Sequence, residues 1–115
     1  MNEIKPQIKY GDFEKLDIRV GTIVSCEKVE KSQKLLKLEV DFGEFGKRQV
    51  LAGMAEFYSP DELQGLQTVF LINLEPRKMM GLESQGMLLA VGLEDNKKPV
   101  LLTLSEETQN GEGAR

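Results

Sequence analysis

The sequence has no histidine and no tryptophan, and Cys26 is the single cysteine among its 115 residues. Without histidine, Ser-His-Asp catalysis, Cys-His catalysis and histidine-ligated metal sites are excluded. One cysteine can form neither an internal disulfide nor a cysteine-cluster zinc site, which favours a reducing compartment, and we expect the cytoplasm. We interpret Cys26 as a small buried apolar residue rather than a reactive thiol.

Long apolar runs and a strong net charge are also missing. No run approaches the roughly 18 apolar residues of a membrane helix, and residues 1–12 are polar and charged, so we expect neither a membrane span nor a signal peptide. The 15 Lys and Arg against 19 Asp and Glu give a net charge of −4. This excludes a globally basic nucleic-acid binder but allows a local basic patch. The length predicts one domain, residues 1–115.

Most of the regular patterns predict β-strands. Ile18, Val20, Thr22 and Val24 fall on one face of a strand by period-2 alternation, and Gly21 within this run indicates a bulge or bend. The segment 35–42 alternates in the same way. Further strands are predicted for residues 47–53, 68–74, 86–91 and 99–104.

A helix is predicted between the third and fourth strands. Ser59 is a favoured N-cap, Pro60 a favoured first helical residue, and Glu62 completes a capping box. A short helical turn is also expected from Asp12, as its cap, to Lys15. Five strands with a helix between the third and fourth are typical of the OB-fold barrel, an all-β fold with minor α content. The segment 99–104 is additional to that barrel.

An unusually long connection joins the fourth and fifth predicted strands. It carries the cations Arg77 and Lys78, the polar residues Ser84 and Gln85, and then Met87. The cations can hold phosphates, the polar groups can hydrogen-bond base edges or a ribose, and the methionine offers a flexible apolar surface. A solvated turn followed by a core methionine is the structural alternative.

A second basic group lies at the first connection between strands, where four lysines recur at three-residue spacing from residue 28 to residue 37. Lys31 and Lys34 flank Ser32 and Gln33 in that loop. In an OB-fold this loop lies near the connection between strands four and five, so both basic groups are expected along one groove. A solvated hairpin tip is the alternative interpretation.

Catalytic patterns are absent from the sequence. It has no carboxylate pair at useful spacing and no glycine-rich phosphate loop. We therefore expect a protein that is not an enzyme by itself, with no cofactor and no metal.

Several blocks of the sequence resemble the tRNA-binding domain family. This family includes a free-standing dimeric tRNA-binding protein, the C-terminal extension of bacterial methionyl-tRNA synthetases, and accessory proteins of tRNA synthetases. The blocks are DFEKLDIRVGTI, VEKSQKLLKLEVDFG, RQVLAGMAEFYSPDELQG, NLEPRK and ESQGM, and they cover almost the whole chain. The last two are the most specific.

The resemblance implies an OB barrel (about 12–92) and a C-terminal β extension (about 93–115) that builds a homodimer. It implies structure-selective, non-catalytic binding of tRNA that assists aminoacylation, either by a free-standing protein or by the C-terminal domain of methionyl-tRNA synthetase. The implied partners are tRNA, a second copy of the chain and an aminoacyl-tRNA synthetase. With Lys31 from the basic loop, the expected tRNA-binding residues are Lys31, Lys34, Asn73, Arg77, Lys78, Ser84, Gln85 and Met87. Glu30-Lys31-Ser32 and Gln33 depart from the family pattern and make the loop more positive.

A second hypothesis is a small dimeric chaperone-like protein that binds unfolded or export-bound polypeptides, as a relative of the family does. Met54, Met79, Met80 and Met87 would supply its adaptable apolar surface. The block from Pro76 to Met87 resembles the tRNA-binding branch instead.

Overall fold

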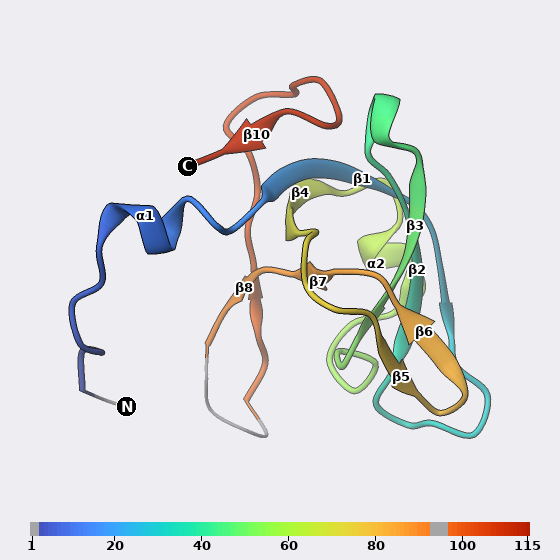
Figure 1. Ribbon diagram of the computed structural model, residues 1–115. Helices are drawn as coiled ribbons and strands as arrows, with labels where there is room; N and C mark the ends of the chain where they lie inside the picture. Colours follow the sequence, from blue (N-terminus) through green and yellow to red (C-terminus); the bar gives the residue numbers. More distant parts are fainter. Residues whose placement is uncertain (1–2, 93–96) are drawn as a thin grey trace.

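The computed structural model describes residues 3–92 and 97–115, and Figure 1 shows a barrel with short flanking segments. Its elements are α1 (Tyr10–Phe13), β1 (Ile18–Lys28), β2 (Leu36–Asp41), the 3₁₀ turn η1 (Gly43–Phe45), β3 (Lys47–Ala52), α2 (Pro60–Leu63), β4 (Gln67–Leu71), β5 (Arg77–Met79), β6 (Leu82–Ser84), β7 (Met87–Leu88), β8 (Ala90–Val91), β9 (Val100–Leu101) and β10 (Gly113–Ala114). No helix among these residues is long and apolar enough to cross a membrane.

Five strands form a nearly closed antiparallel barrel in the order β3-β2-β1-β4-β7. Hydrogen bonds from β3 to residues 83–85 bring the two edges of the sheet together. The predicted all-β OB-fold is therefore confirmed. The predicted strand over 86–91 is divided, because β7 pairs with β4 whereas β8 leaves the barrel to pair with β9.

The barrel interior is aliphatic with two packed rings. Leu36, Leu38 and Val40 on β2, with Phe42 directly after it, are fully buried, as the period-2 pattern predicts. The rings of Phe42 and Phe70 meet edge to face, with their centroids 5.3 Å apart. This strand thus carries much of the core.

The apolar residues of β1 do not all face the barrel interior. Val20 is buried but does not belong to the core cluster, and its N–H donates to the Glu112 carbonyl of the returning C-terminal segment at 2.9 Å. Gly21 and Ile23 face the interior. The register shifts between Ile23 and Ser25, so the next interior residue is Cys26. The irregularity of β1 therefore lies two to four residues after Gly21, where the sequence indicated a bulge or bend.

The predicted helix start at Ser59 is confirmed. Its N–H donates to Glu62 Oε1 at 2.9 Å, Pro60 is the first residue of α2, and Leu63 is buried. At α1 the prediction was wrong by one turn, since the helix begins at Tyr10 with Lys9 as N-cap. The carboxylate of Asp12 accepts the Lys9 N–H at 3.1 Å, so Asp12 is the third helical residue rather than the cap.

The C-terminal segment folds back over the barrel. Only Val100–Leu101 of the predicted strand 99–104 is regular, and residues 93–96 of the expected extension lie outside the described residues. Beyond β9 the chain returns to β1, where Gly111 N–H donates to the Val20 carbonyl at 2.8 Å and β10 pairs with Ile18 and Arg19.

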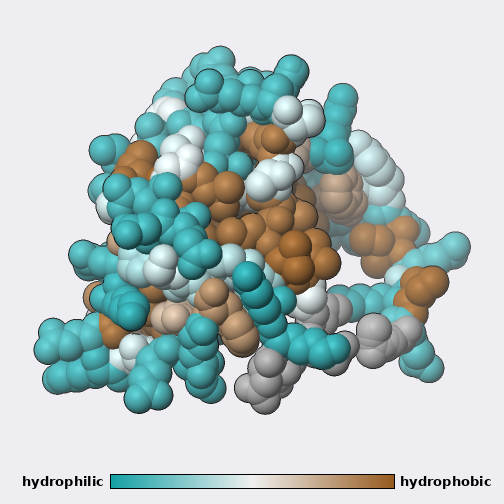
Figure 2. Space-filling model, turned by 180° about the vertical axis from the view of Figure 1, so that it is seen from behind, coloured by the Kyte–Doolittle hydropathy of each residue, from teal (hydrophilic) through white to brown (hydrophobic). Residues whose placement is uncertain are grey.

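Apolar surface gathers in the middle of the face that Figure 2 shows, opposite the view of Figure 1. Large exposed apolar side chains lie on β8, on β9 and in the N-terminal segment. These are Ile4, Ile8, Leu16, Val91 and Val100.

Candidate nucleic-acid interface

Two connections that are about fifty residues apart in the sequence lie side by side at one end of the barrel. The loop between β1 and β2 sits next to the hairpin of β5 and β6 (Figure 1). Together they line a cavity of about 440 Å³, with Val29, Lys31 and Lys37 on one side and Met80 and Leu82 on the other. The loop and the hairpin therefore lie together, and the lining of the cavity includes Lys31 but not Lys34, Arg77 or Lys78. That the two basic groups face one groove stays a prediction.

The loop between β1 and β2 is held by its own backbone and by one hydroxyl group. Ser32 N–H donates to the Val29 carbonyl at 3.1 Å. Ser32 Oγ accepts the N–H groups of Lys34 and Leu35 at 3.2 and 3.1 Å. Lys31 and Lys34 are both exposed on this loop.

The long connection between β4 and β7 contains a regular hairpin that the sequence analysis missed. Met79 pairs with Leu82, and Met80 and Gly81 between them have φ values of 52° and 79°. Two consecutive positive φ values define a type I′ turn, the tight turn that suits a two-residue hairpin. Met80-Gly81 was the available signal, but methionine is unusual at its first position. Arg77 and Lys78 are exposed on β5.

Ser84 and Gln85 close the barrel in the structure. Ser84 is 4% exposed, and its Oγ accepts Leu51 N–H and donates to the Gly86 carbonyl, both at 3.0 Å. Gln85 N–H donates to the Gln49 carbonyl at 2.8 Å, and Gln85 Oε1 accepts Gln49 N–H at 3.1 Å. These side-chain groups join the hairpin to the edge of β3.

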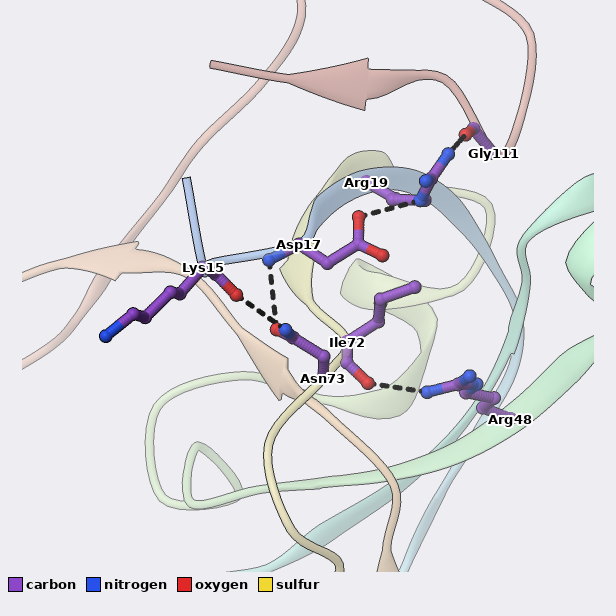
Figure 3. Close-up of polar contacts among 7 residues, drawn as sticks. All are labelled: Lys15, Asp17, Arg19, Arg48, Ile72, Asn73 and Gly111. Carbon is purple, nitrogen blue, oxygen red and sulfur yellow. Dashed lines mark hydrogen bonds and ion pairs between the residues drawn. The ribbon is translucent and has the colours of Figure 1, made fainter. Parts of the chain in front are cut away.

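Asn73 connects the end of β4 with the segment before β1 (Figure 3). Its Oδ1 accepts Asp17 N–H at 2.9 Å, and its Nδ2 donates to the Lys15 carbonyl at 2.7 Å. Both ends of the amide are therefore used within the chain.

Arg48 is a functional candidate that the sequence analysis missed. Its Nη1 donates to the Ile72 carbonyl at 2.6 Å (Figure 3). The same nitrogen lies 3.4 Å from the Gln85 carbonyl. The guanidinium of Arg48 thus contacts both ends of the connection that carries Arg77 and Lys78. No local pattern indicates this, because an arginine near the start of a strand equally suits a solvated position.

Gly86, just before β7, lies close to the backbone of β4. A Cβ atom at Gly86 would lie 3.2 Å from the Leu71 carbonyl oxygen, and Gly86 has a φ of 152°, so glycine suits this position. Met87 then pairs with Leu71 and remains 40% exposed.

The cations of the two connections are available for ligands. Within residues 3–92 and 97–115, the ion pairs are Lys15–Asp12, Arg19–Asp17 and Lys37–Glu27, the last at 2.7 Å. None of them involves the four cations of the candidate site, which are Lys31, Lys34, Arg77 and Lys78.

Cys26 is a buried thiol. Burial, with a smaller contribution from the charge of Glu27, raises the pKa of Cys26 to about 11. The neutral thiol therefore dominates near neutral pH, which agrees with the interpretation as a small buried residue. No group of metal-ligating side chains occurs among the residues that the structure describes.

The fold is that of an OB-type domain, and the two connections carry the exposed cations Lys31, Lys34, Arg77 and Lys78. The family model described as "Putative tRNA binding domain" matches residues 18–113. The chain belongs to this tRNA-binding domain family, as the sequence blocks indicated.

Similar proteins include methionine–tRNA ligases, a MetRS related protein and chaperones. The methionine–tRNA ligase of Archaeoglobus fulgidus is 50% identical over 109 residues, which cover 95% of this chain and 16% of that protein. The chain thus spans about a sixth of the length of this relative. A MetRS related protein from Pyrococcus horikoshii has a TM-score of 0.89 and 36% identity, covering 96% of this chain and 100% of that one. The chaperone CsaA of Bacillus anthracis has a TM-score of 0.84 and 32% identity, with coverages of 96% and 100%.

Proposed function

We propose that this domain binds tRNA by its shape, without catalysis, and assists aminoacylation in the cytoplasm. It does so either as a free-standing protein or as the C-terminal domain of a methionyl-tRNA synthetase. The observation that carries the proposal is the convergence of two basic connections on one end of the barrel. Lys31 and Lys34 come from the loop between β1 and β2, and Arg77 and Lys78 come from β5 (Figure 1).

The net charge of −4 is compatible with this proposal. Exposed charges act over about 8 Å at physiological salt, so a phosphate beside these cations senses them more than it senses carboxylates on the far side of the barrel. Glu27 and Glu30 lie nearer, in the lining of the cavity, and weaken the attraction there. Few phosphate contacts mean weak, salt-sensitive binding. Three or four contacts give a slope of about −3 for log K against log salt.

The eight expected site residues divide into two roles in this proposal. Lys31, Lys34, Arg77 and Lys78 contact phosphates, and Met87 offers an exposed apolar contact. Asn73, Ser84 and Gln85 support binding by holding the connection in place, since their polar groups make the internal hydrogen bonds described above.

Titration of bulk tRNA at several salt concentrations tests the site. Arg77→Ala with Lys78→Ala should weaken binding at least tenfold, and the salt slope should fall by about 1.4 to 1.8 if both cations meet phosphates. Lys5→Ala with Lys9→Ala removes the same charge from the N-terminal segment, away from the hairpin (Figure 1), and is the matched control. Equal losses in both double variants would contradict the site assignment.

We also propose a homodimer that uses the C-terminal extension. The exposed apolar side chains of Val91 and Val100 on β8 and β9, with those of Ile4 and Ile8, support a surface that a second copy covers. Two sites on one dimer would raise the affinity for tRNA by avidity. Val91→Asp with Val100→Asp should give a monomer in sedimentation velocity, and an unchanged mass would refute this interface.

A chaperone-like function is the second candidate. The likeness to the solved structure titled chaperone CsaA favours it, together with the exposed side chains of Met80 and Met87. Suppression of aggregation of an unfolded polypeptide at stoichiometric ratios, unaffected by added tRNA, would support this function over tRNA binding.

A further inference from the structure

Two non-glycine residues among those that the structure describes have a positive φ, and both line the same cavity. Lys31 has a φ of 73° and Met80 a φ of 52°. They come from different connections, the loop between β1 and β2 and the hairpin of β5 and β6. Left-handed backbone is unfavourable for side chains of this size, and such residues cluster at functional sites.

The local turn chemistry alone would select other residues at both positions. Met80 is the first central residue of a type I′ turn, where asparagine is favoured before glycine. Lys31 has a positive φ at the third position of the turn from Val29 to Ser32, which is the type II pattern and favours glycine or asparagine. The side chain of Met80 is 56% exposed, so packing within the chain does not account for methionine there.

The lining of the cavity indicates what it can hold. Val29, Met80 and Leu82 provide apolar surface. Glu27 and Glu30 also line it, and carboxylates repel a phosphate placed inside. Lysines line it as well, including Lys31. The volume of about 440 Å³ lies within the range of small-molecule sites.

We propose that this cavity takes one unpaired nucleobase of the bound RNA, with Met80 against the face of the base and Lys31 beside a flanking phosphate. The inference rests on the proposed tRNA binding. A base offers a flat face to the apolar wall and N–H donors to the carboxylates, whereas a phosphate offers neither. Methionine is suited to this contact because its thioether is polarizable and adaptable.

A fluorescence experiment tests base insertion directly. The chain has no tryptophan, so Met80→Trp places a single reporter at the cavity. Stacking of a base on the indole should quench its emission during titration with bulk tRNA and should tighten binding. Tyr10→Trp, at an exposed position in α1, is the control and should not be quenched. Equal emission changes in the two variants, with tRNA bound, would overturn the inference.

Met80→Asn separates binding from folding. Asparagine suits the turn, so the midpoint of thermal unfolding should stay the same or rise. Affinity for tRNA should fall about three- to tenfold, with an unchanged salt slope because no charge is removed. Wild-type affinity in this variant would overturn the inference while leaving the proposed function intact. Failure of the unsubstituted protein to bind tRNA would overturn both.

Discussion

Replacement of Arg48 by methionine should loosen the connection that carries the basic hairpin. The substitution keeps an unbranched side chain but removes the donor to the Ile72 carbonyl, which lies 2.6 Å away in a residue that is 7% exposed. A hydrogen bond from a charged group contributes about 1.5–3 kcal/mol, and the 3.4 Å contact to Gln85 adds little. We therefore expect a loss of about 2 kcal/mol, which lowers the Tm of a 115-residue domain by about 8 °C.

Thermal unfolding followed by circular dichroism measures this effect, and tRNA titration measures its consequence. Since Arg48 donates to carbonyl groups, tRNA affinity should fall in Arg48→Met without a change in the salt slope. A phosphate contact would instead reduce the slope by about 0.7 to 0.9.

Arg48→Lys is the matched control because it retains the charge without the planar donor group. If Arg48 acts by holding the connection through its hydrogen bonds, this variant should have a lower Tm and a lower affinity for tRNA. A Tm within about 1 °C of the wild type for Arg48→Met would refute the structural role of Arg48. Full tRNA binding by Arg48→Lys, together with a reduced salt slope in Arg48→Met, would show a phosphate contact instead.

Three further predictions concern the scaffold. Gly21→Ala should destabilise the domain by about 1–3 kcal/mol in chemical denaturation, because the new Cβ would lie 2.6 Å from Val40 Cγ1 and 2.7 Å from Phe42 Cε1; an unchanged midpoint would contradict the packing. Cys26, with a pKa of about 11, should react with thiol reagents far more slowly in the folded protein than in denaturant at pH 8, and its rate should rise as the pH approaches 11. Asn73→Ala removes two hydrogen bonds and should cost about 1–2 kcal/mol and speed proteolysis before β1, whereas an unchanged digestion rate would count against this role.

The parts of the fold that the sequence predicts are those set by local rules. Leu36 to Phe42 alternate strictly because one face of β2 is buried, and a one-residue shift would expose the whole set. The start of α2 is equally local, because Ser59, Pro60 and Glu62 satisfy the helix end among themselves.

The closure of the barrel could not be predicted in the same way. Ser84 and Gln85 have polar groups that could face either RNA or the backbone of β3, and only the three-dimensional position of Leu51 and Gln49 decides between them. The partners of Arg48 lie 24 and 37 residues away in the sequence. Long-range hydrogen bonds of this kind leave no periodic pattern in the chain.

The return of the C-terminal segment to β1 has a consequence for association between molecules. β2 pairs with β1 only from Thr22 onward, so the N-terminal half of that edge would otherwise present free backbone donors and acceptors. Residues 111–114 occupy it, through the bonds of Gly111 and Glu112 to Val20 and the pairing of β10 with Ile18. An uncovered strand edge is a template for uncontrolled pairing with other chains. Residues 111–114 therefore leave the N-terminal half of this β1 edge without free backbone groups for pairing with another chain.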